Sequence, residues 1–309
     1  YFGSQLFTSQ TKWLSPDILK GDVDVRDYVG YLCVAKLDIT DKTAPKLYSI
    51  SKKAGKNTEL IVDASLFVDA SSGYVTYYKT YADTKTIKVQ IENTLTVYRN
   101  LVKDFSTNIT YTPGDVSYKF VDTDNNGKYD KAFITNEKSF VIGSVNVASN
   151  KIFRETANAN AMYTYSIASL LLDDEDDSVD WSLKDASGND LTLADLKAGQ
   201  VLNVRISNDG PYTFYDILIT EEKIDGMITE VYSETKKVGG GLDWFYKIGD
   251  KAYKTVSSVS LNPGDTITAT LNNQGKIIMY SSANTMNYGV VTGVQLTSSF
   301  GITAQVHLM

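Results

Sequence analysis

The residues with the clearest potential for chemistry form one acidic loop, residues 122–130. The loop reads Asp-Thr-Asp-Asn-Asn-Gly-Lys-Tyr-Asp and carries side-chain oxygens at its first, third, fifth and ninth positions. Calcium takes several oxygen ligands at about 2.3–2.6 Å, and loops with this spacing supply them. A calcium site is therefore one interpretation of this loop, and calcium is the one candidate cofactor. The predicted ligands are Asp122, Asp124, Asn126, the Lys128 carbonyl and Asp130.

The same loop also suits a hairpin turn that needs no metal, because Asn and Gly tolerate positive φ. The twelfth position is Phe133, where an EF-hand has a bidentate Glu, so an EF-hand is excluded. Comparable turns at residues 207–210 and 272–275 lack the carboxylate pair. Two interpretations stay open: a looser calcium loop that borrows a ligand from elsewhere, and a plain turn.

Catalytic machinery is scarce in this sequence. The single His, His307, lies close to the end of the chain, which disfavours Ser-His-Asp, Cys-His and His-based zinc sites. The 37 acidic residues offer many carboxylate pairs, but no pair stands out. The Gly-rich stretch 239–241 lacks the Gly-Lys-Ser/Thr of a phosphate loop. We predict no catalytic residue and expect that the protein is not an enzyme.

Two other kinds of chemistry depend on tertiary structure. Aromatic residues could form a flat platform for stacking sugars, although aromatics at alternate strand positions more often fill a β core. A lysine–asparagine crosslink would need a buried lysine, asparagine and acid together, which one sequence does not show. The aromatic candidates are Trp181, Tyr212, Phe214, Tyr215, Trp244, Phe245 and Tyr246.

A repeated pattern predicts the elements that position these residues. Three segments, 111–116, 196–201 and 261–266, each read as a turn around Pro-Gly or Ala-Gly. Each is followed by an alternating strand, a second Gly turn and another apolar strand. Such repetition is typical of tandem β modules. Further strands are expected at 31–37, 58–62 and 86–91, and one helical turn at 191–196.

Composition supports an all-β fold of tandem small β-sandwich or β-barrel-like modules joined by shared strands or short linkers. Of the 309 residues, 42% are hydrophobic and 21 are Tyr, values that suit folded, half-buried strands. The net charge of −7 argues against nucleic acid as a partner. No run of 18 apolar residues could span a bilayer. The single Cys, Cys33, lies in a strand pattern and is expected to be a small buried hydrophobe.

Module boundaries follow from a second repeated phrase, rich in Val and Ile, at residues 141–145, 227–231 and 290–294. There the last strand of one module is expected to run into the first strand of the next. Both chain ends resemble cut ends or strands that await a partner. The expected division is an N-terminal arm and possible donor strand (1–28), three modules (29–142, 143–229 and 230–289), and the start of an incomplete module or a donor strand (290–309).

Several phrases together resemble modules of surface-layer and surface-layer-homology-containing proteins of Firmicutes, chiefly clostridial relatives. They lie at 95–100, 113–116, 120–130, 132–135, 143–145 and 288–294. They are spread over about half of the chain and are moderately specific, since acidic Asn-Gly hairpins recur in unrelated β proteins. The resemblance implies an exported protein at the cell surface that forms assemblies and has no enzymatic activity.

Two functions from different classes are therefore expected to compete. In the first, the chain is an extracellular, self-assembling subunit of a surface layer or filament, with calcium as a stabiliser and with a terminal strand that completes a neighbour's module. In the second, it is a polysaccharide-binding or spacer region of a larger cell-surface adhesin or enzyme. Its partners would be further copies of itself in the first case and cell-wall polysaccharide in the second.

Overall fold

The computed structural model describes residues 28–38, 46–105, 108–173 and 175–282, together with the short strands at 294–296 and 304–306. Its elements in the described part are β-strands and two single 3-10 turns, η3 (Val147–Ser149) and η4 (Leu193–Asp195). The all-β fold class is confirmed. The expected helical turn at 191–196 is η4, which Thr192 and Asp195 cap reciprocally.

The repeated turn–strand–turn–strand pattern folds as three antiparallel hairpins, as predicted. Each second Gly turn connects the two strands of its hairpin, and each pair runs in antiparallel register. The pairs are β9 (Val116–Asp122) with β10 (Tyr129–Asn146), β14 (Val201–Asp209) with β15 (Tyr212–Thr220), and β19 (Thr266–Leu271) with β20 (Ile277–Ser282).

The first turn of each copy has a shared backbone role. Gly114, Gly199 and Gly264 adopt φ values of 109°, 87° and 99°, a region that favours glycine. The carbonyl after each glycine then accepts a hydrogen bond from a strand that runs between units. These bonds are Glu137 N–H to Asp115 O at 3.1 Å, Ile142 N–H to Gln200 O at 2.8 Å, and Ile228 N–H to Asp265 O at 2.8 Å.

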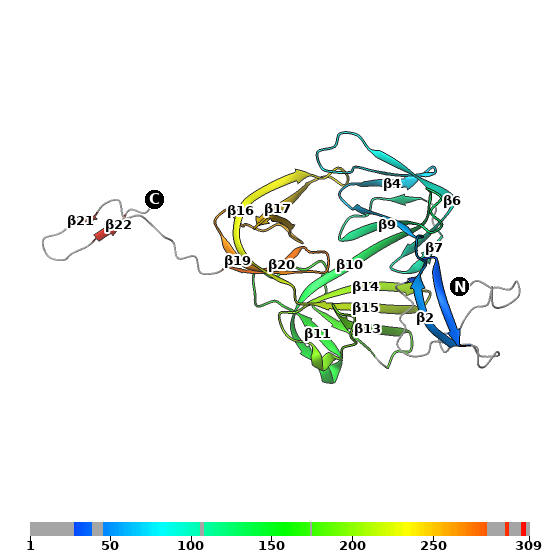
Figure 1. Cartoon of the computed structure of the whole chain (residues 1–309). Helices are drawn as coiled ribbons and strands as arrows, with labels where there is room; N and C mark the ends of the chain where they lie inside the picture. Colours follow the sequence, from blue (N-terminus) through cyan, green and yellow to red (C-terminus); the bar gives the residue numbers. More distant parts are fainter. Residues whose placement is uncertain are drawn as a thin grey trace, which may run out of the picture.

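Three hydrophobic cores divide the described body into three units, which Figure 1 shows around the long strand β10. The first unit is built from β9, the first half of β10 and the strands that precede them. Its core centres on Phe67, Tyr118 and Phe120, whose rings stack. The preceding strands are β3 (Thr58–Asp63), β4 (Phe67–Ser71), β5 (Tyr74–Tyr77), β6 (Ile87–Arg99), β7 (Val102–Asp104) and β8 (Ile109–Thr110).

The second unit joins the second half of β10 to β14 and β15, and its core includes Phe140, Leu202 and Ile217. The third unit is a five-stranded sheet in the order β18-β17-β16-β19-β20. The remaining strands of the two units are β11 (Lys151–Arg154), β12 (Ser169–Leu171), β13 (Val179–Asp185), β16 (Lys223–Thr235), β17 (Leu242–Ile248) and β18 (Lys251–Lys254).

Strand β10 contributes to all three cores. Its first half carries Ala132 and Ile134 into the first core, and Phe140 enters the second. Val141, on the opposite face, packs in the core of the third unit. The expected boundary at 142/143 thus falls within β10, and the one at 229/230 falls within β16. A strand shared in this way fixes the angle between units, because no flexible linker intervenes.

Two pairs of strands form separate two-stranded sheets, with no hydrogen bonds to any other described strand. They are β1 (Cys33–Asp38) with β2 (Lys46–Lys52), and β21 (Val294–Leu296) with β22 (Ala304–Val306). Both pairs are antiparallel. The predicted N-terminal arm with its possible donor strand (1–28) lies outside the described residues apart from residue 28, as does most of the predicted segment 290–309.

The thiol of Cys33 is half-buried instead of fully buried, which corrects the expectation from the sequence. Burial raises the pKa of Cys33, and the charge of Lys52 only partly offsets this effect. The thiol Sγ lies 3.5 Å from the carbonyl of Tyr31.

None of the helices in the described ranges is long and apolar enough to cross a membrane.

Candidate functional site

The predicted calcium loop between β9 and β10 is held closed by hydrogen bonds to its own backbone. Asp122, only 4% exposed, accepts from Asn126 N–H at 3.2 Å and from Gly127 N–H at 2.8 Å. Asp124 also accepts from Asn126 N–H, and the Asn126 side chain accepts from Lys128 N–H. Asp and Asn side chains close turns in this way without a metal.

The remaining predicted ligand, Asp130, faces other partners. Its carboxylate accepts from Thr123 N–H and Oγ1, each at 2.8 Å, and pairs with Lys131 at 2.6 Å. Burial opposes ionisation, but these contacts outweigh it and lower the pKa of Asp130. The structure thus brings Asp122, Asp124 and Asn126 together and turns Asp130 towards Thr123 and Lys131.

One further acid lies close to the loop. Glu92 on β6 contacts Asn126 Nδ2 at 3.0 Å and is the nearest additional acid that the hydrogen bonds identify. In the described ranges, no three His, Cys, Asp or Glu side chains are gathered as a metal centre. We therefore derive no chemistry from calcium here, and the calcium site stays a prediction from the sequence.

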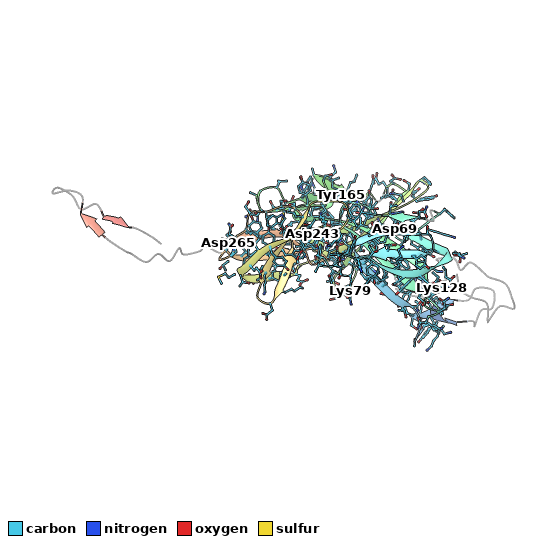
Figure 2. All side chains as sticks on the ribbon, turned by 90° about the horizontal axis from the view of Figure 1, so that it is seen from above. Asp69, Lys79, Lys128, Tyr165, Asp243 and Asp265 are labelled. Atoms are coloured by element: carbon cyan, nitrogen blue, oxygen red, sulfur yellow. The ribbon has the colours of Figure 1, made fainter. Side chains whose placement is uncertain are left out.

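A polar cluster joins the first unit to the third, and the sequence did not predict it. We call it the Asp243 cluster: Asp63, Ser65, Tyr81, Asp243 and Lys254. Asp243 Oδ2 accepts hydrogen bonds from Ser65 Oγ at 2.6 Å, from Tyr81 Oη at 2.6 Å and from Lys254 Nζ at 3.1 Å. In Figure 2, Asp243 lies between Asp265 of the third unit and Asp69 of the first.

The lysine of this cluster bridges both units. Lys254 Nζ also donates to Asp63 Oδ2 at 3.1 Å and to Tyr81 Oη at 2.6 Å. The side chains of Lys254 and Asp243 are 18% and 13% exposed, so solvent screens their attraction only in part. Phe245 covers the cluster, since its ring meets Tyr81 edge-on at 5.7 Å and stacks on Tyr232 at 5.0 Å.

The electrostatics hold both charges in their ionised forms. Burial opposes ionisation of Asp243, but hydrogen bonds from Ser65 and Tyr81 and the charge of Lys254 outweigh it and lower the pKa of Asp243 to about 2. Burial and the bond to Asp243 raise the pKa of Tyr81 to about 12. Burial alone would lower the pKa of Lys254, yet Asp63 and Tyr81 raise it overall. The ion pairs and hydrogen bonds of the cluster therefore stabilise the contact between the first and third units.

A second cluster joins the same two units. We call it the Asp115 cluster: Asp115, Glu137, Asn273 and Lys276. Lys276 Nζ forms an ion pair with Asp115 Oδ1, and their side chains are 24% and 8% exposed. Asn273 Nδ2 donates to Glu137 Oε2 at 3.0 Å, and Glu137 N–H donates to Asp115 O at 3.1 Å.

The environment of Glu137 favours the neutral form of its carboxyl group. Glu137 is 5% exposed. Burial raises its pKa; the Asn273 amide and the charge of Arg205 lower it less, and Asp115 raises it further. The backbone of Asn273 is held in turn, since its N–H donates to Asn203 Oδ1 on β14 at 3.0 Å. The β19–β20 turn of the third unit is thereby docked on the first and second units.

The predicted aromatic platform is divided between two sheets. Trp181 and Tyr215 pack against the core of the second unit, whereas Tyr246, 2% exposed, is in the third core. Only Tyr212 and Trp244 are well exposed, at 62% and 41%. They belong to β15 and β17, in different sheets. The seven aromatics therefore do not form one sugar-stacking surface.

A cleft of 540 Å³ lies where the β1–β2 pair rests on the body. Its aromatic rings and cations pack on one another: Tyr31 stacks on Phe133 at 5.6 Å, and Lys52 lies 3.5 Å from the centre of the Tyr31 ring. Asn57 fixes the entry to β1 by bonding both backbone groups of Leu32, at 2.8 and 2.9 Å. The cleft attaches β1–β2 to the first unit.

Neither inter-unit cluster was predicted from the sequence, because the members of each cluster lie far apart along the chain. Their individual residues carried a weak signal only: Asp115 and Lys276 fall in the repeated Gly turns, and Asp243 follows the Gly-rich stretch 239–241.

Comparison with protein-family models, with curated proteins and with solved structures finds no match to this chain.

Proposed function

We propose that this chain is a non-enzymatic extracellular structural protein whose copies assemble into a surface layer or a filament. The observation that carries the proposal is a contrast within the molecule. Polar clusters hold the three units together, whereas two strand pairs have backbone edges that no described strand covers. The Asp243 and Asp115 clusters tie the first unit to the third, while β1–β2 and β21–β22 pair only with themselves among the described strands. A two-stranded sheet is at best marginally stable alone, so a partner strand is favoured.

The β1–β2 pair also presents apolar side chains to solvent. Val34 and Tyr48 are 48% and 66% exposed, and Ile61 on the nearby edge strand β3 is 68% exposed. Open backbone edges combined with apolar side chains favour the addition of a strand from another chain. We assign the partner as a second copy of this protein, with calcium at residues 122–130 as a stabiliser of the first unit.

Negative-stain electron microscopy of the purified chain tests this proposal, with millimolar calcium and with chelator. We expect ordered sheets or filaments, and Val34→Lys should prevent them because a charge on an edge strand opposes pairing. Val147→Lys is the matched control, since Val147 is 52% exposed but lies in η3, outside any strand. Monodisperse particles of the unchanged chain in both conditions would contradict self-assembly.

The alternative is a polysaccharide-binding or spacer region of a larger surface protein, and the exposed Trp244 and Tyr212 are the features that favour binding. Retention of the chain on an insoluble cell-wall or plant glycan, lost in Trp244→Ala, would support this function. A chain that assembles and is retained on none of these glycans would support the structural function alone.

A further inference from the structure

The Asp115 cluster contains two buried carboxylate oxygens that its hydrogen bonds leave unused. Asp115 Oδ2 and Glu137 Oε1 are both buried and accept no hydrogen bond from the described residues. A buried, unpaired carboxylate oxygen is costly because the group has lost its hydration without compensation. The contact between Lys276 Nζ and Asp115 Oδ1 places an amine directly against one of these two carboxyl groups.

We propose that Lys276 and Asp115 condense to an intramolecular amide bond, assisted by Glu137. The Lys276 ammonium and the Asp115 carboxylate together lose one water molecule. A proton first leaves Nζ, the nitrogen lone pair attacks Cγ of Asp115, and a bond from Cγ to one carboxylate oxygen then breaks. That oxygen departs as water with two protons that came from the ammonium. No oxidant, metal or other co-reactant is required.

Glu137 is suited to carry the proton between the two groups. It lies beside Asp115, to whose carbonyl its own N–H donates at 3.1 Å, and Asn273 fixes its Oε2 at 3.0 Å. Burial raises its pKa, which favours a neutral carboxylic acid that can donate a proton to the departing oxygen and recover it from the amine. Glu137 ends in the protonation state in which it began.

The product also accounts for the burial of the site. Condensation removes one positive charge, one negative charge and one oxygen atom from a region where Asp115 and Glu137 are 7% and 5% exposed. The new bond would join residues 161 positions apart and link the first unit covalently to the third. Such a link suits a surface protein, but the inference does not depend on the proposed assembly.

The Asp243 cluster provides an internal comparison. Lys254 and Asp243, which both belong to the third unit, are also in contact, at 3.1 Å. There, hydrogen bonds from Ser65 and Tyr81 and the positive charge of Lys254 stabilise the carboxylate, which is a poor electrophile in that form. We expect that this second pair remains an ordinary ion pair.

The mass of the intact, denatured full-length chain tests the inference directly. We expect a mass lower than that of the sequence by one water molecule, and a protease digest in which the peptides that contain Asp115 and Lys276 are joined. No joined peptide should contain Lys254 and Asp243. An unmodified mass, unchanged after prolonged incubation of the folded protein, would overturn the proposal and leave an ion pair only.

Three variants separate the chemistry from folding. Lys276→Arg keeps the positive charge but not the amine nucleophile, so the full sequence mass should return while the circular dichroism spectrum is retained. Glu137→Gln keeps the shape of the side chain and should slow or abolish the mass loss with Lys276 and Asp115 intact. Lys254→Arg is the matched control and should leave the loss of water unchanged. Water loss that persists in Lys276→Arg would place the modification elsewhere and refute the assignment.

Discussion

Tyr81 donates a 2.6 Å hydrogen bond to Asp243, a residue 162 positions further along the chain. Tyr81 belongs to the loop between β5 and β6 of the first unit, and Asp243 belongs to β17 of the third. Lys254 completes the contact by donating to both of them. One hydroxyl, one carboxylate and one ammonium thus hold two units in a fixed relation, and each can be removed separately.

Substitution Asp243→Asn should reduce the sensitivity of the protein to acid. The folded-state pKa of Asp243, about 2, lies below its ordinary value of 3.8, so the ionised carboxylate stabilises the fold above about pH 4, and this contribution disappears as the pH falls towards 2. A shift of this size corresponds to roughly 2 kcal/mol. Denaturant unfolding at several pH values should show that the unchanged protein loses about this much more stability than Asp243→Asn.

The control for this prediction is Asp250→Asn, because Asp250 is exposed in the turn between β17 and β18. It should follow the unchanged protein at every pH. Parallel pH profiles for the unchanged protein and Asp243→Asn would show that Asp243 is not selectively stabilised in its ionised form.

Substitution Tyr81→Phe should lower the free energy of unfolding by about 1–2 kcal/mol, because Asp243 and Lys254 each lose one buried hydrogen-bond partner. The pKa of Tyr81, about 12, is raised above its ordinary value of 10.0, so the contribution of the neutral hydroxyl is complete below about pH 10 and is lost as the pH rises to about 12. Ultraviolet absorbance should show that the variant lacks a tyrosine that ionises near pH 12. Tyr212→Phe, at an exposed position, should change neither quantity.

The acidic loop can be tested with and without calcium. Asp122→Ala should destabilise the protein by about 1–3 kcal/mol in chelator, because Gly127 N–H loses its acceptor and Asn126 N–H loses one of its two acceptors. The sequence-based prediction of a calcium site adds that calcium raises the unfolding midpoint, and that Asp124→Ala removes this increase. Equal midpoints in calcium and chelator for the unchanged protein would leave a loop closed by hydrogen bonds alone.

Substitution Gly143→Ala should destabilise the shared strand β10. A Cβ atom at this position would lie 2.9 Å from Glu155 Cα and 3.0 Å from Arg154 O, and both of these are backbone atoms that cannot move aside independently. Overpacking of this kind costs about 1–3 kcal/mol. Ser144→Ala, on the exposed neighbour, should have little effect in the same thermal unfolding measurement. An equal loss in both variants would argue against the close approach at Gly143.

The local features of this fold could be predicted from the sequence. Positive φ at Gly114, Gly199 and Gly264, and alternation of apolar residues in the following strands, depend on a few neighbouring residues each. The hairpins, the strand at residues 58–63 and the single turn at 193–195 were therefore recognisable. The acidic loop was also recognisable as a turn, because its Asp and Asn side chains bond to backbone groups within the same loop.

Tertiary structure alone decided which distant residues meet. The sequence placed Asp115 in the first Gly turn of one repeat and Lys276 in the second Gly turn of another, but only the packing of the third unit against β10 brings their side chains together. The same packing buries Glu137 and thereby raises its pKa. Periodicity reports which face of a strand is apolar; it carries no information on which strand covers that face. The sequence alone therefore determined the strands and turns of this protein, and the association of its three units determined the chemistry of the residues between them.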